Sequence, residues 1–281
     1  MTEWVEKNKA HFNEAASTYN AKFSKTILQI IDKIQARRDW IGVDWIEDSS
    51  EDSENSNSSA ANPSAGNEGK TVKLLDYACG TGLISRAFAP YVSQCIGVDI
   101  SESMVNEYNA GATNQGIAED EMHAVVGDLI APTPSATLSG AKFEGFDIAA
   151  VGMGWHHFEN PLLAAHRLAD RLKVGGVLFI IDFLPFDDPK SAQAQAHSHG
   201  ASHHHAHEEG KGKHSENEEI SHQAVRFITH FGFSEDEMMK VFESAGVGGG
   251  FEYMTLGEGT VFKHSGQDMK RSVFMARGTK L

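Results

Sequence analysis

The chain has only two cysteines, Cys79 and Cys95, among its 281 residues, too few for a disulfide framework or a thiolate zinc site. No apolar run approaches the length of a membrane-spanning helix, and the N-terminus lacks the apolar region of a signal peptide. Basic residues are also scarce: 24 lysines and arginines stand against 39 aspartates and glutamates, a formal net charge of −15. Such a charge argues against nonspecific binding to nucleic acid or anionic lipid. We expect a cytoplasmic protein, with the nucleus left open as a second location, without a membrane span or a nucleic-acid partner.

Two polar stretches interrupt a composition that otherwise suits a packed core. Residues 47–69 are acidic and then rich in serine and asparagine, and residues 187–222 hold eight of the fifteen histidines. Neither stretch can bury enough apolar surface to offset its ordering entropy, so we predict polar loops, the first of them disordered. The first loop separates a helical N-terminal segment, 1–46, from residues 70–281. No cysteine or regular spacing marks a metal site in the second, although ion capture by its histidines stays open.

The segment from Leu74 to Arg86 predicts a buried strand, a turn with two glycines and the start of a helix. Asp76 lies near the end of the strand, and Gly80 and Gly82 form the turn. A strand that leads through a tight glycine turn into a helix is typical of the nucleotide-binding corner of a doubly wound sheet. The third glycine of a dinucleotide fingerprint is missing.

Further strands and helices follow in an alternating order. Asp99 ends the next strand, 23 residues after Asp76, at the spacing of a strand-end carboxylate that meets ribose hydroxyls. Amphipathic patterns and capping residues predict helices over 2–38, 160–172 and 234–246. Apolar runs predict a third strand and its exit at 123–129, a fourth strand that runs into a loop at 143–158, and further strands at 173–183, 251–256 and 272–277.

These segments resemble, in order, the motifs of the class I S-adenosylmethionine-dependent methyltransferases. The run D-Y-A-C-G-T-G at 76–82 resembles motif I, with Ala78 where a glycine is usual, and G-V-D-I-S-E-S-M at 97–104 resembles the second motif. The G-D-L at 127–129 resembles the adenine site, and the segments 146–158 and 172–182 resemble motifs IV and V. Residues 12–20 resemble the segment that forms a lid in small-molecule methyltransferases, especially the ubiquinone/menaquinone-biosynthesis type.

The resemblance implies one Rossmann-like α/β domain, with a seven-stranded, mostly parallel sheet flanked by helices and closed by a C-terminal antiparallel strand pair. It also implies methyl transfer from S-adenosyl-L-methionine to a small-molecule acceptor. Asp76 would face the amino acid part of the cofactor, Asp99 its ribose, and Asp128 its adenine amine. The full set of cofactor-binding residues that it implies is Tyr19, Asp76, Ala78, Gly80, Thr81, Gly82, Asp99, Ile100, Met104, Gly127, Asp128, Leu129 and Val151. Tyr19 could instead simply pack on the sheet.

Two adjacent histidines, His156 and His157, are the candidates for a catalytic base, because the loop after the fourth strand lies at the ligand-binding edge of such a sheet. The alternative is that one ring packs beneath the cofactor and the other fixes the loop. On an extended loop neighbouring side chains point to opposite sides, so we expect only one of them to face the active site.

Two other functions remain open at this stage. The first is a methyltransferase-fold subunit of a regulatory complex, which would dock a protein partner through the acidic loop and modify a protein such as a histone. The second is an NAD-dependent dehydrogenase, which the missing glycine and the closing strand pair disfavour.

Overall fold

A computed structural model describes residues 2–46, 69–133, 135–186, 228–257, 259–264 and 267–281. Almost all of the predicted acidic loop and the whole histidine-rich insertion therefore lie outside the described residues. Within the described ranges, no helix is long and apolar enough to cross a membrane. Cys79 and Cys95 are both buried and free.

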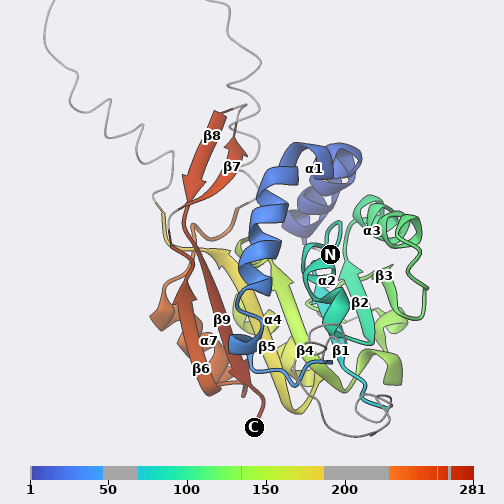
Figure 1. Ribbon diagram of the computed structural model, residues 1–281. Coiled ribbons are helices and arrows are strands. Elements are labelled where there is room, and N and C mark those ends of the chain that lie inside the picture. Colours follow the sequence, from blue (N-terminus) through green and yellow to red (C-terminus); the bar gives the residue numbers. More distant parts are fainter. Residues whose placement is uncertain (1, 47–68, 134, 187–227, 258, 265–266) are drawn as a thin grey trace, which may run out of the picture.

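Seven strands form one sheet in the order β3-β2-β1-β4-β5-β9-β6 (Figure 1). The first five run parallel, and β9 pairs antiparallel with both β5 and β6. This arrangement confirms the predicted mostly parallel sheet with its closing antiparallel pair. The strands are β1 Lys73–Tyr77, β2 Gln94–Asp99, β3 Met122–Val126, β4 Phe146–Gly152, β5 Leu172–Phe183, β6 Gly249–Thr255 and β9 Val273–Thr279.

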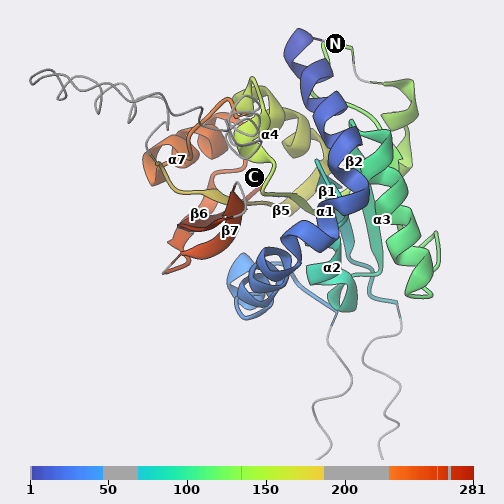
Figure 2. The ribbon, with the colours of Figure 1, turned by 90° about the horizontal axis from the view of Figure 1, so that it is seen from above.

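Helices cover both faces of the sheet, which explains the continuous apolar runs of its central strands. Figure 2 shows α2 (Leu83–Phe88) and α3 (Glu102–Asn114) on one face, and α4 (Pro161–Arg171) and α7 (Glu235–Ser244) on the other. Neighbouring strand residues point to opposite faces, so the core divides in two: Leu74 joins the cluster under α2 and α3, and Leu75 joins the one under α4 and α7.

The predicted helix starts are confirmed by their caps. Asn160 accepts a hydrogen bond from Leu163 N, and Ser234 and Glu237 form a complete capping box. Gly246 then takes a positive φ of 73° just after α7, where the sequence predicts the helix end.

Along the chain, a hairpin that the sequence patterns did not predict lies between β6 and β9. Strands β7 (Thr260–His264) and β8 (Gln267–Arg271) form a separate two-stranded sheet. It is anchored on α1 (Glu3–Gln35), since Thr26 Oγ1 donates to the carbonyl of Val261 at 2.5 Å. The C-terminal half of α1 is therefore held by the hairpin as well as by its own buried isoleucines.

Helix α1 crosses the carboxyl edge of the parallel strands, as Figure 2 shows from above. At its start, Trp4 Nε1 donates to the carbonyl of His157, which follows β4. In its middle, Asn13 Oδ1 accepts from Ser101 Oγ at 2.7 Å and from Ser103 N at 3.1 Å, at the start of α3. The segment predicted to be a lid thus lies over the edge at which open α/β sheets bind ligands.

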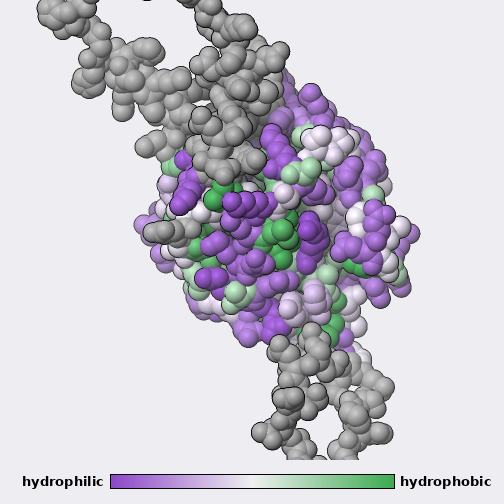
Figure 3. Space-filling view, turned by 45° about the horizontal axis from the view of Figure 1, so that its top comes forward, coloured by the Kyte–Doolittle hydropathy of each residue, from purple (hydrophilic) through white to green (hydrophobic). Residues whose placement is uncertain are grey.

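The surface seen in Figure 3 is mainly hydrophilic and carries separate, small hydrophobic patches. Among the described residues, the exposed large apolar side chains are scattered over different elements: Leu28, Val126, Leu162, Val174, Met239 and Leu281. Single exposed apolar residues of this kind are normal on a protein surface and mark no docking face.

Replacing residues 48–68 with a short Gly-Ser linker should leave the fold intact. Lys70 Nζ contacts Asp44 Oδ1 and the carbonyl of Trp45, both at 2.7 Å, so the two ends of the replaced segment already lie together. A shorter loop changes the closure free energy by about 1 kcal/mol or less, and the melting temperature should therefore shift by no more than about 4 °C. Loss of the cooperative unfolding transition in calorimetry would contradict this expectation.

Candidate active site

The turn after β1 is built from three residues with left-handed backbone. Ala78, Gly80 and Gly82 have φ values of 54°, 51° and 90°. A Cβ placed on Gly82 would lie 3.0 Å from the ring of Tyr108, whereas a Cβ on Gly80 would meet nothing within 4 Å. Gly80 therefore faces open space, as a backbone that must approach a ligand closely should. Ala78 adopts at some strain the conformation for which a glycine is usual.

Asp76 is buried and turned toward α2. Its Oδ2 accepts hydrogen bonds from Ser85 N at 3.0 Å and Ser85 Oγ at 2.8 Å, in the first turn of that helix. Tyr108 donates in turn to Ser85 Oγ at 2.7 Å. Asp76 thus caps α2, where a carboxylate also suits the helix dipole. Burial, opposed by the two bonds from Ser85, raises the pKa of Asp76 to about 7.

Asp99 connects two turns of the site. Its Oδ2 accepts from Gly80 N at 2.8 Å, and its Oδ1 accepts from Ser101 N at 2.9 Å. Burial raises the pKa of this carboxyl, and the backbone N–H groups of Ser101 and Gly80 oppose the shift. The predicted strand-end carboxylate therefore lies directly against the glycine turn.

Asp128 organises the turn after β3. Its Oδ1 accepts from the Tyr77 hydroxyl at 3.2 Å, from Ile130 N at 2.8 Å and from Ala131 N at 3.1 Å. All of these bonds go to one oxygen, Oδ1, and the side chain of Asp128 is half-buried.

The three strand-end carboxylates share a site with little compensating positive charge. Within the described ranges, no lysine or arginine forms an ion pair with Asp76, Asp99 or Asp128. Burial, assisted by the charge of Asp99, raises the pKa of Tyr19 on α1 to about 12. An edge of this kind favours a cationic ligand and disfavours an anionic one such as a pyrophosphate.

The remaining residues predicted to bind a cofactor fall into two groups. Those near the surface of the edge are Thr81, whose hydroxyl donates to Asn20 Oδ1 at 2.7 Å, the half-buried Tyr19 and Ile100, and Gly127, whose N–H donates to the Asp99 carbonyl. Met104, Leu129 and Val151 are no more than 1% exposed. These three side chains support the edge from beneath, and their contact with a cofactor stays a prediction.

The two candidate bases lie side by side, so the expectation of opposite orientations is wrong. Their ring centroids are 4.1 Å apart, because residues Trp155–His157 form a 3-10 turn instead of an extended loop. His156 is 5% exposed, and its Nδ1 lies 2.7 Å from Oδ1 of Asp182. The ring of His157 packs edge-on against Phe12 of α1 at 5.2 Å.

Four contacts of the site escaped prediction. Asp182 ends the segment 172–182 that resembles motif V, but nothing in the sequence signals its pairing with His156. Thr229 donates through its N–H to the His156 carbonyl at 3.0 Å, and Asn13 and Asn20 join α1 to the turns after β2 and β1. The Tyr-Asn pair at the end of the lid motif was the one available signal for Asn20.

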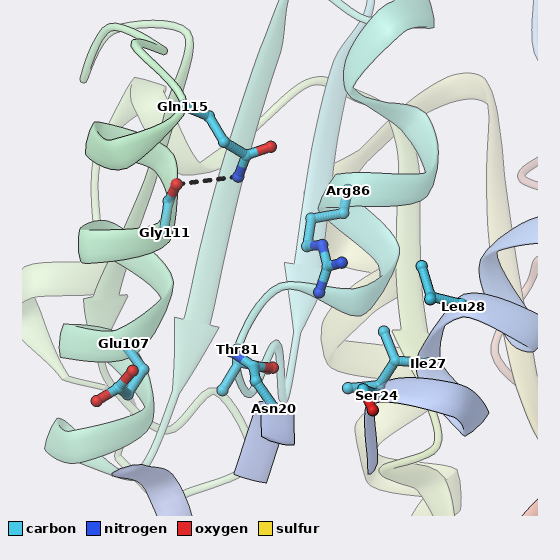
Figure 4. A pocket seen from close by; sticks show the side chains of 9 residues that line it. All are labelled: Asn20, Ser24, Ile27, Leu28, Thr81, Arg86, Glu107, Gly111 and Gln115. Carbon is cyan, nitrogen blue, oxygen red and sulfur yellow. Dashed lines mark hydrogen bonds between the residues drawn. The ribbon is translucent and has the colours of Figure 1, made fainter. Parts of the chain in front are cut away.

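A pocket of about 340 Å³ opens between α1, α2 and α3 (Figure 4). Arg86 on α2 and Glu107 on α3 line it from opposite sides. Its lining reaches the glycine turn at Thr81 but includes none of the strand-end carboxylates and neither histidine. This hollow therefore adjoins the predicted site at Thr81 and extends away from the strand-end carboxylates. Its lining residues are Asn20, Ser24, Ile27, Leu28, Thr81, Arg86, Glu107, Gly111 and Gln115.

Comparison with known families gives a match over most of the chain. Residues 33–247 match the model of a family described as a methyltransferase domain. The match contains the glycine turn, all three strand-end carboxylates and both histidines.

Curated relatives point the same way. A methyltransferase of Schizosaccharomyces pombe is 33% identical over 121 residues, which are 42% of this chain and 40% of that protein. The methyltransferase YcgJ of Bacillus subtilis is 29% identical over 42% of this chain and 43% of its own length, so the chain spans less than half of both of these relatives. The ubiquinone/menaquinone biosynthesis C-methyltransferase UbiE of Hydrogenovibrio crunogenus is 26% identical over 69% of this chain and 72% of that protein. UbiE belongs to the ubiquinone/menaquinone-biosynthesis type, which is the type that the sequence motifs of this chain resemble.

Solved structures share the fold. A SAM-dependent methyltransferase from Thermotoga maritima aligns with 99% of this chain and 100% of its own, at a TM-score of 0.53 and 14% identity. The DhpI–SAM–HEP complex aligns over 99% of both chains, at a TM-score of 0.52 and 15% identity. At these identities the likeness shows the Rossmann-like methyltransferase fold.

Ala78→Gly should stabilise the protein by up to about 1 kcal/mol. It removes a left-handed alanine, which costs about 1–2 kcal/mol, and adds the larger chain entropy of an unfolded glycine, about 0.5–1 kcal/mol. The matched control is Gly82→Ala, which introduces a Cβ at a φ of 90° and 3.0 Å from the Tyr108 ring and should destabilise. Urea unfolding measures both variants, and a destabilised Ala78→Gly would refute the strain at this turn.

Asp76→Asn should stabilise the protein increasingly as the pH rises from about 5 to 8. The folded pKa of Asp76 is raised from 3.8 to about 7, so the folded state holds this proton more tightly than the unfolded chain does. The contribution of Asp76 to stability is therefore complete below about pH 4 and is lost as the pH rises toward 7. Asparagine keeps the neutral shape at every pH, and the difference in unfolding free energy should approach a few kcal/mol, about 4 at most. A difference that does not change with pH would show that Asp76 is charged throughout.

Proposed function

Because this chain belongs to the methyltransferase-domain family, we propose that it transfers a methyl group from S-adenosylmethionine to a small-molecule acceptor at the carboxyl edge of β1, β2, β4 and β5. The observation that carries the proposal is the set of strand-end carboxylates without cationic partners, arranged around a left-handed glycine turn. S-adenosylmethionine, when bound, supplies a methyl group that its positively charged sulfur has already activated.

The residues at this edge fit that cofactor. The open face of Gly80 admits a close ligand, and Asp99 beside it can accept from ribose hydroxyls with the lone pairs that its backbone bonds leave. The carboxylate of Asp128 can accept from an adenine amine. An edge lined by acids and without paired lysines or arginines suits a ligand that carries both a sulfonium and an ammonium group.

The same arrangement argues against the dehydrogenase alternative. A dinucleotide would bring a doubly charged pyrophosphate to a turn beside Asp76 and Asp99, where the described residues provide no ion-pairing lysine or arginine for either carboxylate. The antiparallel β9 also closes the sheet in the way that the methyltransferase fold does.

The position of α1 supports a small acceptor. This helix lies over the edge and contacts the turn after β4 through Trp4 and Phe12. An acceptor must therefore reach the methyl group beside or beneath the helix, which a small molecule does more easily than a folded protein surface. The assembly alternative has no observation in its favour, because the acidic loop on which it depends lies outside the described residues.

We expect the purified protein to bind S-adenosylmethionine and its demethylated product with micromolar affinity, and NAD much more weakly.

Asp99→Asn should weaken the binding of S-adenosylmethionine by about 1–3 kcal/mol, because it removes charge-assisted hydrogen bonds to the ribose. Isothermal calorimetry measures the dissociation constants of the wild type and of the Asp99→Asn variant. The matched control is Asp147→Asn, at the opposite end of β4, where the carboxylate accepts from Lys73 N at 2.7 Å and pairs with Lys173. Binding of NAD but of neither sulfur compound would overturn the proposal.

A further inference from the structure

A buried histidine and a buried aspartate meet where β4 and β5 reach the ligand-binding edge. Asp182 lies near the end of β5 and is 0% exposed, and His156 follows β4. The 2.7 Å contact between His156 Nδ1 and Asp182 Oδ1 joins them. Buried ionisable groups are costly unless they are paired, so this pair is a specific feature of the site.

The bonds of Asp182 determine which nitrogen of His156 carries the proton. Besides the imidazole, Asp182 accepts from Phe183 N at 2.7 Å and from His156 N at 3.2 Å. These two backbone N–H groups favour the ionised form of Asp182, and an ionised carboxylate acts only as an acceptor. Nδ1 of His156 must therefore donate, which leaves the lone pair of the imidazole on Nε2.

The surroundings of the His156 ring are mostly aromatic. Phe183 of β5 lies 5.0 Å away and His157 lies 4.1 Å away, centroid to centroid. Helix α1 brings His11 and Phe12 toward His157, and the segment after residue 227 brings His230, whose backbone N–H donates to the His156 carbonyl. Asp182 is the carboxylate that holds His156 in one orientation, and His157 and Phe183 flank the ring.

We propose that Asp182 is a positioning residue that holds His156 with its proton on Nδ1, so that Nε2 serves as the base for an acceptor that must lose a proton. The proposal rests on the function proposed above. The acceptor atom forms its bond to the methyl carbon as the carbon–sulfur bond breaks, and the bonding electrons stay on sulfur. The acceptor proton passes to Nε2, the imidazolium is stabilised by the Asp182 carboxylate, and water removes the proton afterwards. The acceptor group is therefore a hydroxyl, a thiol or an acidic C–H.

The test compares the wild type with Asp182→Asn, His156→Gln and the control Asp147→Asn. Each is incubated with methyl-labelled S-adenosylmethionine and a deproteinised cell extract, and the initial rate per mole of folded protein is measured from about pH 6 to 9. Asp182→Asn should lower the rate near neutral pH roughly 10–100-fold, the usual effect of losing the partner that orients a histidine. His156→Gln should lower it roughly 10²–10⁴-fold. Both deficits should shrink as the pH rises and the acceptor ionises unaided, while Asp147→Asn keeps the wild-type profile.

A purely structural pair gives a different result. It would lower the melting temperature of Asp182→Asn and leave the rate per folded mole and its pH profile unchanged, and this outcome overturns the inference. A parallel incubation uses whole cell extract, which is afterwards separated into a protein and a small-molecule fraction. Label that enters only the protein fraction would contradict the small-molecule acceptor, and the variants are then compared on that fraction.

Absence of label from both fractions would contradict the proposed function itself. Nitrogen NMR of the His156 ring in labelled protein then decides the inference. A proton on Nδ1 in the wild type that moves to Nε2 in Asp182→Asn supports the positioning role. A proton on Nε2 in the wild type overturns it.

Discussion

The hydrogen bonds of Asp99 hold the ligand-binding edge together. One carboxylate fixes Gly80 in the turn after β1 and Ser101 in the turn after β2, so the two turns cannot move independently. Ser101 then caps α3 and donates to Asn13 of α1. A single buried side chain therefore links the glycine turn, the second turn and the helix above them. Burial raises the pKa of this carboxyl, and the backbone N–H groups that it binds oppose the rise.

The charge of the edge follows from the geometry of parallel strands. Each strand ends at the same side of the sheet, so acids that are distant in the sequence converge there. The three acids do different work in the structure: Asp76 caps α2, Asp99 joins two turns and Asp128 shapes the turn after β3. Because each also performs a local structural task, a substitution at any of them affects folding and ligand binding together. Both must therefore be measured in every variant.

Sequence patterns predict what is local and miss what depends on register. The strands and the caps at Asn160 and Ser234 are encoded in periodicity and in single residues, and the structure confirms them. The mostly parallel sheet, which the family resemblance implies, is confirmed as well. The pairing of Asp182 with His156 joins residues 26 apart through the register of β4 and β5, in which Gly152 stands opposite Ile181, and no local pattern encodes that. The 3-10 turn at Trp155–His157 was missed because Gly154, which precedes it, is as compatible with an extended loop as with a turn. The hairpin β7–β8 is short and polar, and its contacts with α1 are equally non-local.

The two halves of α1 are held by different forces. The C-terminal half buries Ile27, Ile30, Ile31 and Ile34 in the core that α2 and α3 cover, and burial of such side chains contributes about 1.5–3 kcal/mol each. The N-terminal half and the middle of the helix are attached by hydrogen bonds that Trp4 donates and that Asn13 and Asn20 accept. Each such bond has a net worth of about 1 kcal/mol because water replaces it on opening. The half that covers the edge is therefore the weaker one. Local opening should begin at the N-terminal end of α1, while its C-terminal half stays packed in the core.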